Sequence, residues 1–228
     1  MRKKFLSTGL FGLCIFMLFV LPSSASALII DMETPFSGDT PSGSIVATFT
    51  SIDATHVQLY LDAQNLQNSG EFISNWYFNL NPALTISDIS IAFVSETGNG
   101  SSSNWNYGTD AFQAGPDGNY DILLAFSTSN AGGGVNRFGA GETLTFMITY
   151  NGAGSFSDES FNVPSASGGG AGVFLSAAHV QGIGTDNEGS AWVGPNGTTA
   201  VPEPTILILL IGPALAVVLG FRKKMKKG

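Results

Sequence analysis

The middle of this chain has almost no positive charge. Nine Lys and Arg occur in 228 residues, but three lie at positions 2–4 and five at positions 222–227. Arg137 is therefore the only Lys or Arg between residues 28 and 200, where it faces 16 acidic residues, a net charge of −15 (1 − 16). Polyanions are bound by basic patches, so this balance excludes nucleic acid and anionic lipid as partners of the region. It suits a solvated extracellular domain, or one that collects divalent cations.

Cysteine and histidine are nearly absent as well. Cys14 is the single cysteine, and it lies in an N-terminal apolar run after Leu13, where a lipoprotein signal would need a small residue. Once that run is removed, the chain can form neither a disulfide nor a thiolate metal site. His56 and His179 are the only histidines, and no ligands are spaced around them for zinc. We expect no cofactor.

The N-terminus has the three parts of a secretory signal peptide. Three basic residues at 2–4 precede an apolar segment at 10–21, and the small residues Ala25 and Ala27 flank a serine. This pattern predicts export by the Sec machinery and cleavage by signal peptidase after Ala27, so that residues 1–27 form the leader. The alternative is an uncleaved membrane helix.

The C-terminus, residues 201–228, also has three parts. A stiff polar motif comes first, then an uncharged apolar run at 205–221, which as a helix spans about 25 Å against a hydrocarbon core of about 30 Å. The run predicts a single transmembrane helix, and the basic residues after it predict a cytoplasmic end. The motif is Val201, Pro202, Glu203 and Pro204, and the membrane stop is Arg222, Lys223, Lys224, Lys226 and Lys227.

This order of motif, helix and basic cluster resembles the PEP-CTERM sorting signal. The resemblance implies processing by exosortase, a membrane-embedded, cysteine transpeptidase-like enzyme of Gram-negative bacteria that cuts near the motif. It implies a protein held in the inner membrane facing the periplasm, then passed to the cell surface or to the exopolysaccharide of a biofilm matrix. The alternative is a plain single-pass anchor that no enzyme cuts.

Between the two ends, the composition predicts an all-β domain. Gly, Ser, Thr and Asn are abundant, and short segments alternate apolar with polar residues between Gly- and Asn-rich breaks. We expect an antiparallel β-sandwich or jelly-roll ectodomain at 28–194 and a linker at 195–200.

The alternation also predicts individual strands and their buried faces. Val57, Leu59 and Leu61 should point inward, and a change of parity near Ser87 predicts a bulge or bend. Loops are expected at 34–42 and 98–108. The expected strands are 28–33, 45–49, 55–62, 71–80, 89–93, 120–126, 143–150 and 173–181, with shorter ones at 161–163 and 191–193.

Two groups of residues are candidate binding sites. Asp117, Asn119 and Asp121 place oxygen ligands at alternate positions, as calcium loops do, but Ile122 and Thr128 stand where an EF-hand needs Gly and Glu. A simple turn is the alternative. Trp105 and Tyr107 lie in the polar stretch 98–108 and could stack on a sugar; alternatively, Trp105 covers an end of the sandwich.

No catalytic constellation is recognisable. There is no Gly-x-Ser-x-Gly elbow, and the 16 acids do not reveal a glycosidase pair. The sequence therefore favours an exported, non-enzymatic surface or matrix protein. The alternatives are a carbohydrate-binding adhesion module, with exopolysaccharide as its partner, and a secreted polysaccharide hydrolase.

Overall fold

The computed structural model describes residues 26–98, 103–168 and 172–196. The predicted leader up to residue 25 and the predicted sorting tail at 201–228 lie outside these residues, so they remain predictions. Within the described ranges, no helix is both long and apolar enough to cross a membrane.

The prediction of an all-β, antiparallel domain is confirmed. Within the described ranges, eleven strands form one sheet in the order β5-β9-β3-β2-β1-β11-β10-β4-β7-β6, with β8 paired to β4. The strands are β1 (Ala27–Gly38), β2 (Ile45–Ser51), β3 (His56–Asp62), β4 (Phe72–Phe78), β5 (Ile89–Thr97), β6 (Ser103–Gln113), β7 (Asn119–Phe126), β8 (Phe138–Gly139), β9 (Thr143–Tyr150), β10 (Ser176–Ile183) and β11 (Gly189–Pro195). Short 3-10 turns lie at η1 (Ile86–Asp88), η2 (Ala131–Gly133) and η3 (Asp158–Phe161).

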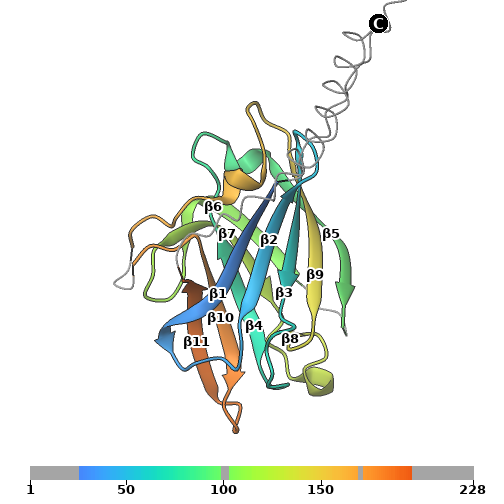
Figure 1. Cartoon of the computed structure of the whole chain (residues 1–228), viewed down its shortest axis with the longest axis vertical. Coiled ribbons are helices and arrows are strands. Elements are labelled where there is room, and N and C mark those ends of the chain that lie inside the picture. Colours follow the sequence, from blue (N-terminus) through green and yellow to red (C-terminus); the bar gives the residue numbers. More distant parts are fainter. Residues whose placement is uncertain (1–25, 99–102, 169–171, 197–228) are drawn as a thin grey trace, which may run out of the picture.

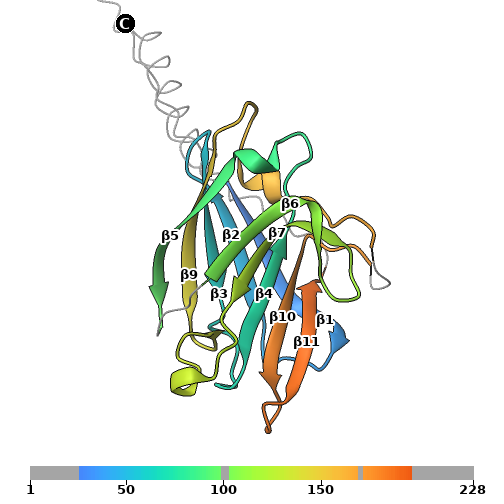
Figure 2. The same ribbon diagram turned by 180° about the vertical axis from the view of Figure 1, so that it is seen from behind.

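The sheet folds over into two layers, and β1 belongs to both. Figure 1 shows β2, β3, β9 and β5 in front, and Figure 2 shows β4, β7, β6, β10 and β11 in front after the half turn. The first half of β1, up to Met32, pairs with β2, and from Met32 onward it pairs with β11. Register shifts after Met32 and after Pro35 bend the strand, because a bulge adds a residue to one side of the ladder.

The core lies between the layers and is filled by the apolar residues that alternate along each strand. Phe49 of β2 packs edge-on against Phe78 of β4, with ring centroids 5.1 Å apart. The inward face predicted for β3 is confirmed, since Val57, Leu59 and Leu61 are all fully buried. β9 contributes its alternate residues in the same way: Leu144, Phe146, Ile148 and Tyr150 are buried. Such inner faces form the core of a sandwich.

Three predicted segments differ from the structure. The expected loop at 98–108 is wrong, because β6 begins at Ser103 and pairs with β7. The expected loop at 34–42 is also wrong in its first part, because β1 continues to Gly38. The strand expected at 161–163 is absent, since Phe161 ends the turn η3 instead. The bend near Ser87 is confirmed as η1.

A buried carboxylate fastens η3 to the start of the sheet. Asp158 is 1% exposed. Its carboxylate accepts hydrogen bonds from the hydroxyls of Ser26 at 2.5 Å and Ser51 at 2.6 Å, and its own N–H donates to the Ser51 hydroxyl at 2.9 Å. These bonds join the turn to β2 and to the residue preceding β1.

We expect Asp158→Ala to lower the free energy of unfolding by about 2–3 kcal/mol, because hydrogen bonds to a charged group are worth more than neutral ones and the Ser51 hydroxyl and, where the leader is kept, the Ser26 hydroxyl lose their acceptor. Glu159→Ala is the matched control, since Glu159 is exposed and its carboxylate contacts only the Asn162 amide. Urea denaturation of both variants measures the difference. Equal stabilities would contradict a structural role for the buried carboxylate.

Candidate functional site

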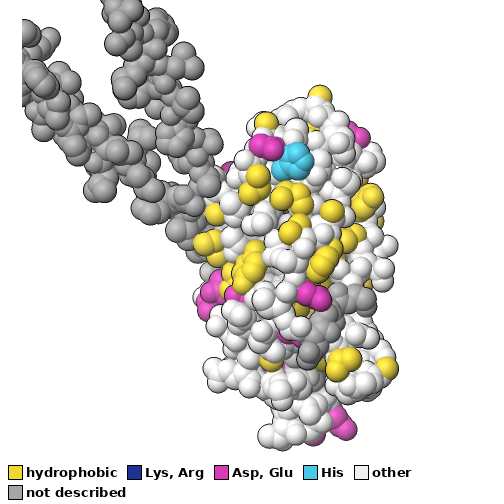
Figure 3. All heavy atoms as spheres, turned by 90° about the vertical axis from the view of Figure 1, so that its right-hand side faces the viewer, with side chains coloured by type: hydrophobic (Ala, Val, Ile, Leu, Met, Phe, Trp, Pro, Cys, Tyr) yellow, Lys and Arg dark blue, Asp and Glu magenta, His cyan; other side chains and the backbone are white. Residues whose placement is uncertain are grey.

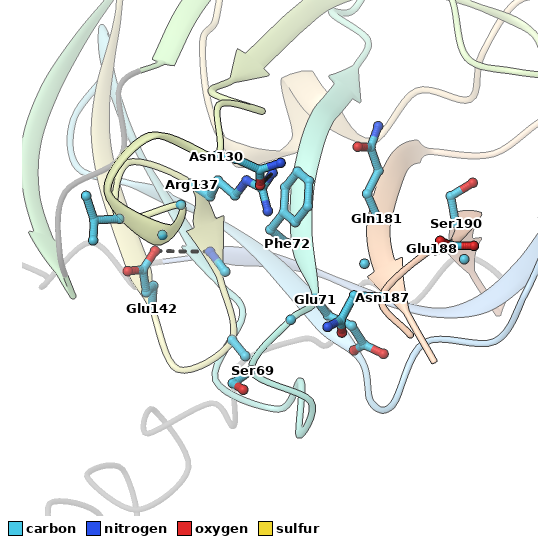
Figure 4. A pocket seen from close by; sticks show the side chains of 18 residues that line it. Ser69, Glu71, Phe72, Asn130, Arg137, Glu142, Gln181, Asn187, Glu188 and Ser190 are labelled. Atoms are coloured by element: carbon cyan, nitrogen blue, oxygen red, sulfur yellow. Dashed lines mark hydrogen bonds between the residues drawn. The ribbon is translucent and has the colours of Figure 1, made fainter. Parts of the chain in front are cut away.

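A polar cleft of about 780 Å³ opens at one end of the β domain. It lies between the segment 69–72 at the start of β4, the loop that leads to and follows β8, and the ends of β10 and β11 (Figure 4). In Figure 1, η2 and the β10–β11 turn mark this lower end of the molecule. The uncharged polar residues around the cleft include Ser69, Asn130, Gln181, Asn187 and Ser190.

Local irregularities in β4 and β10 shape this end. A register shift places Gln181 opposite Phe72 and His179 opposite Asn75, which leaves Ser74 as the extra residue of β4. Gly182 has φ +76°, and a Cβ there would lie 2.1 Å from the Gly70 carbonyl oxygen. Only glycine permits this backbone and this approach. The glycine therefore lets the segment before β4 lie directly against β10.

Arg137 lies in the cleft and is the only Lys or Arg among the described residues. Its guanidinium carbon lies 3.9 Å from the centroid of the Phe72 ring, a cation–π contact. One terminal nitrogen donates to the Thr128 carbonyl at 2.9 Å and to the Asn130 side-chain oxygen. Its Nε is buried without an acceptor in the part of the chain that the structure describes. The cation is thus held by neutral groups, and Figure 4 shows it beside the Phe72 ring.

Three acidic residues line the same cleft, and they differ in what they contact. Glu71 is 2% exposed, and its carboxylate accepts the Ser42 N–H at 3.0 and 3.1 Å and the Ser42 hydroxyl at 2.6 Å. Glu142 accepts the Gly139 N–H at 3.0 Å. Glu188 is exposed, in the turn between β10 and β11. Glu71 and Glu142 therefore support the walls, and Glu188 presents a carboxylate to solvent at the rim.

Beyond Gln181, the outer face of the same layer carries aromatic side chains. His179 stacks on Trp192 with centroids 4.5 Å apart, and the Ser74 hydroxyl lies 3.0 Å from His179 Nδ1. Burial lowers the pKa of His179, so the ring is neutral at pH 7. A Cβ on Gly115 would lie 2.7 Å from ring atoms of Trp192, so the turn at 114–118 covers that ring. Trp192 is therefore held between protein groups.

The predicted sugar-stacking residues lie elsewhere. Trp105 is half-buried and packs edge-on against Phe146 of the other layer, with centroids 5.1 Å apart, so it helps close the sandwich. Tyr107 is 47% exposed on β6. Neither residue lines the cleft.

The side of the molecule that carries β5 presents hydrophobic side chains to solvent. Figure 3 shows hydrophobic side chains spread over this view, with a few acidic ones between them. Phe93 and Val94 of β5 are 54% and 51% exposed. β5 ends the described sheet, and the Phe93 ring contacts the Phe146 ring of β9 there, with centroids 6.0 Å apart.

The three calcium candidates do not converge. Asp117 is fully buried, with one carboxylate oxygen accepting the Tyr120 hydroxyl at 2.5 Å and the other unpartnered in the described structure. Asp121 instead accepts the N–H groups of Leu80 and Asp110, at 3.0 and 2.8 Å. Asn119 pairs through its backbone with Ala166. Among the described residues, no three His, Cys, Asp or Glu side chains gather in a way that could hold a metal.

One feature of the sequence points to the cleft. Arg137 stands alone in an acidic domain and next to the glycine-rich segment 132–134. A single cation in such a segment is a candidate functional residue, but no alternation or motif in the sequence connects Arg137 with Gln181 or Glu188. Only the folded sheet brings these segments together.

The buried carboxyl of Asp117 should make stability fall as pH rises. Burial raises the pKa of Asp117 above its ordinary value, while the Tyr120 hydroxyl opposes the shift. A folded-state pKa above the unfolded value of 3.8 means that the native state binds the proton more tightly. This contribution is full below pH 3.8 and is lost as pH rises through the folded-state pKa. We expect Asp117→Asn to gain melting temperature relative to the unsubstituted chain as pH increases from 4 to 7.

Thermal melts at several pH values measure that difference, and Glu33→Gln, at an exposed position of β1, is the control for a change in net charge. A gap between Asp117→Asn and the unsubstituted chain that stays constant with pH would show that the Asp117 carboxyl titrates as an exposed one.

Comparisons with known proteins leave the family open. No protein-family model matches the chain, and no curated protein matches it. Among solved structures, one described as the unique CBM3 of Hungateiclostridium clariflavum matches 75% of this chain and 99% of its own, with a TM-score of 0.32 and 8% identity. A likeness this distant carries no information about a ligand.

Proposed function

We propose that this protein is an exported, non-enzymatic surface or matrix protein whose β domain binds carbohydrate in the polar cleft. The observation that carries the binding proposal is the character of the cleft lining. Ligand pockets are usually lined by apolar groups with a few polar ones. Here hydrogen-bonding side chains from three separate segments predominate, so the cleft suits a ligand that is itself covered with hydroxyls.

The side chains that line the cleft are also of the types that bind sugars. Amide and carboxylate side chains are planar and offer two polar atoms each, which suits pairs of neighbouring hydroxyls. Asn187, Gln181 and Glu188 provide such groups around the cleft. Val135, 45% exposed, adds an apolar surface for the C–H face of a sugar ring.

The acidic residues support binding without hydrolysis. A glycosidase places two carboxyl groups on either side of the bond that is cut. In this cleft the carboxylates of Glu71 and Glu142 accept the protein's own N–H groups, and Glu71 is almost wholly buried. Glu188 is the acid that faces solvent.

The export and sorting part of the proposal rests on the two ends of the sequence. A leader at 1–27 and the Pro202-Glu203-Pro204 motif, followed by an apolar run and five cations, suit delivery across the inner membrane and processing by an exosortase-like enzyme. The partners are then the Sec machinery, signal peptidase, that transpeptidase and an exopolysaccharide. The acidic, cation-poor domain between the ends agrees with a position outside the cell.

We expect the full chain, kept in a non-ionic detergent, to bind oligosaccharides in titration calorimetry, and Gln181→Ala to weaken that binding about fivefold, the value of one neutral hydrogen bond of about 1 kcal/mol. Gln58→Ala is the matched control, because Gln58 lies on β3 in the opposite layer. Tyr107→Ala tests the alternative site on β6.

Binding that depends on Tyr107 and not on Gln181 would move the site to β6 and remove the cleft from the proposal. Absence of binding to every glycan offered would remove the carbohydrate function altogether.

For the tail, we expect the protein isolated from its native cells to end near Pro202-Glu203-Pro204, because an extended, proline-flanked motif is open to a transpeptidase. Mass spectrometry of the C-terminal peptide makes the measurement. Replacing Pro202 and Pro204 by Ala should leave the peptide intact through Phe221, whereas Thr199→Ala should be cut as before. An intact tail in the unsubstituted protein would favour a plain membrane anchor.

A further inference from the structure

We infer that the cleft selects glycans that carry free amino groups, such as a partly de-N-acetylated hexosamine polymer, over neutral and uronic-acid glycans. This inference rests on the proposed carbohydrate function and names its ligand class. It follows from how charge is arranged around the cleft, in three steps.

The first step is the field of the whole domain. The described residues contain all 16 acids that lie between residues 28 and 200, and Arg137 as the single Lys or Arg. A polymer with a carboxylate on each sugar carries negative charge, as this surface does, and each further sugar would add to the repulsion. A polymer with protonated amines would be attracted, and such attraction acts over about 8 Å at physiological salt.

The second step is the local charge at the rim. Glu188 and Asp186 are exposed in the β10–β11 turn, and Asp39 is exposed beside it, where its carboxylate accepts the Ser190 N–H at 3.2 Å. Asp186 accepts the Glu188 N–H at 3.3 Å, which fixes the turn. Glu188 therefore lines the side of the cleft formed by β10 and β11, and Asp186 and Asp39 lie next to lining residues through these hydrogen bonds.

The third step is the position of the cation. Figure 4 shows Arg137 and Asn130 beside Phe72, with Gln181, Ser190 and Glu188 on the other side. The guanidinium already donates to Thr128 and Asn130 and lies over the Phe72 ring. The guanidinium thus donates to neutral acceptors. An acetamido carbonyl or a hydroxyl oxygen of a sugar would be an acceptor of the same kind. A partly acetylated hexosamine polymer offers that oxygen to Arg137 and an ammonium group to Glu188.

The test is calorimetric titration of the full chain, in a non-ionic detergent, with four oligosaccharides of equal length: glucosamine, N-acetylglucosamine, glucose and a hexuronic acid, each β-1,4-linked. We expect the glucosamine oligomer to bind more tightly than the N-acetylated and glucose oligomers, and the uronic acid to bind most weakly. Glu188→Gln should weaken glucosamine binding about two- to fivefold, as for a solvent-exposed ion pair worth up to about 1 kcal/mol, and should narrow the ratio of glucosamine affinity to glucose affinity.

Glu33→Gln is the matched control, since it makes the same change of net charge at an exposed position of β1. If Glu33→Gln and Glu188→Gln weaken glucosamine binding equally, the selectivity belongs to the general field, and the inference about the cleft is wrong. If glucose or the uronic acid binds as tightly as glucosamine, the inference fails while carbohydrate binding stands. If none of the four binds, the proposed function fails with it.

Discussion

The architecture depends on one strand that serves two layers. β1 pairs with β2 through its first half and with β11 through its second, and the register shifts after Met32 and Pro35 bend it between these partners. Without that bend, β11, β10 and β4 would extend the first layer as a flat sheet and leave its apolar face in water. With it, Phe49 meets Phe78 across a closed core. The hydrophobic core and the outer face that carries the cleft are both consequences of this bend.

The polar lining of the cleft follows from the same arrangement of strands. Once β4, β10 and β11 turn their apolar residues toward β2 and β9, the alternate residues Gln181 and Ser190 face outward. A bulge at Ser74 and the close approach of Gly182 to Gly70 then set where the outward side chains stand. The loop that contains Arg137 reaches this face because β8 pairs with β4. The charged side chains in this polar cleft are three Glu and one Arg, and the rest of its lining is uncharged.

The sequence predicted the parts of the fold that are governed by alternation. β3 and β9 lie in the interior of their layer, so each apolar residue is matched by a buried position, and their faces were predictable. The sequence of β6 predicts a loop because the strand pairs on one side only, which leaves Asn104, Asn106 and Thr109 exposed and interrupts the alternation of apolar and polar residues. The cleft was not predictable, because Glu71, Arg137 and Glu188 are brought together by long-range pairing that leaves no local signal. Asp117 looked like a ligand since composition cannot show that a side chain is buried.

The contact between Ser26 and Asp158 bears on the order of two events, the cleavage of the predicted leader and the pairing of β1 with β2. Ser26 donates to the buried carboxylate, and Ala27 pairs with Thr50 as the first rung of β1. A leader cut after Ala27 would remove both, and a peptidase needs its substrate extended and unpaired. If the leader is cut after Ala27, as the sequence predicts, the cut and the pairing of β1 with β2 compete for the same residues, and cleavage would have to come first. If β1 paired before the leader was cut, the scissile bond would be hidden in the sheet. Slow pairing at this edge of the domain would therefore favour cleavage.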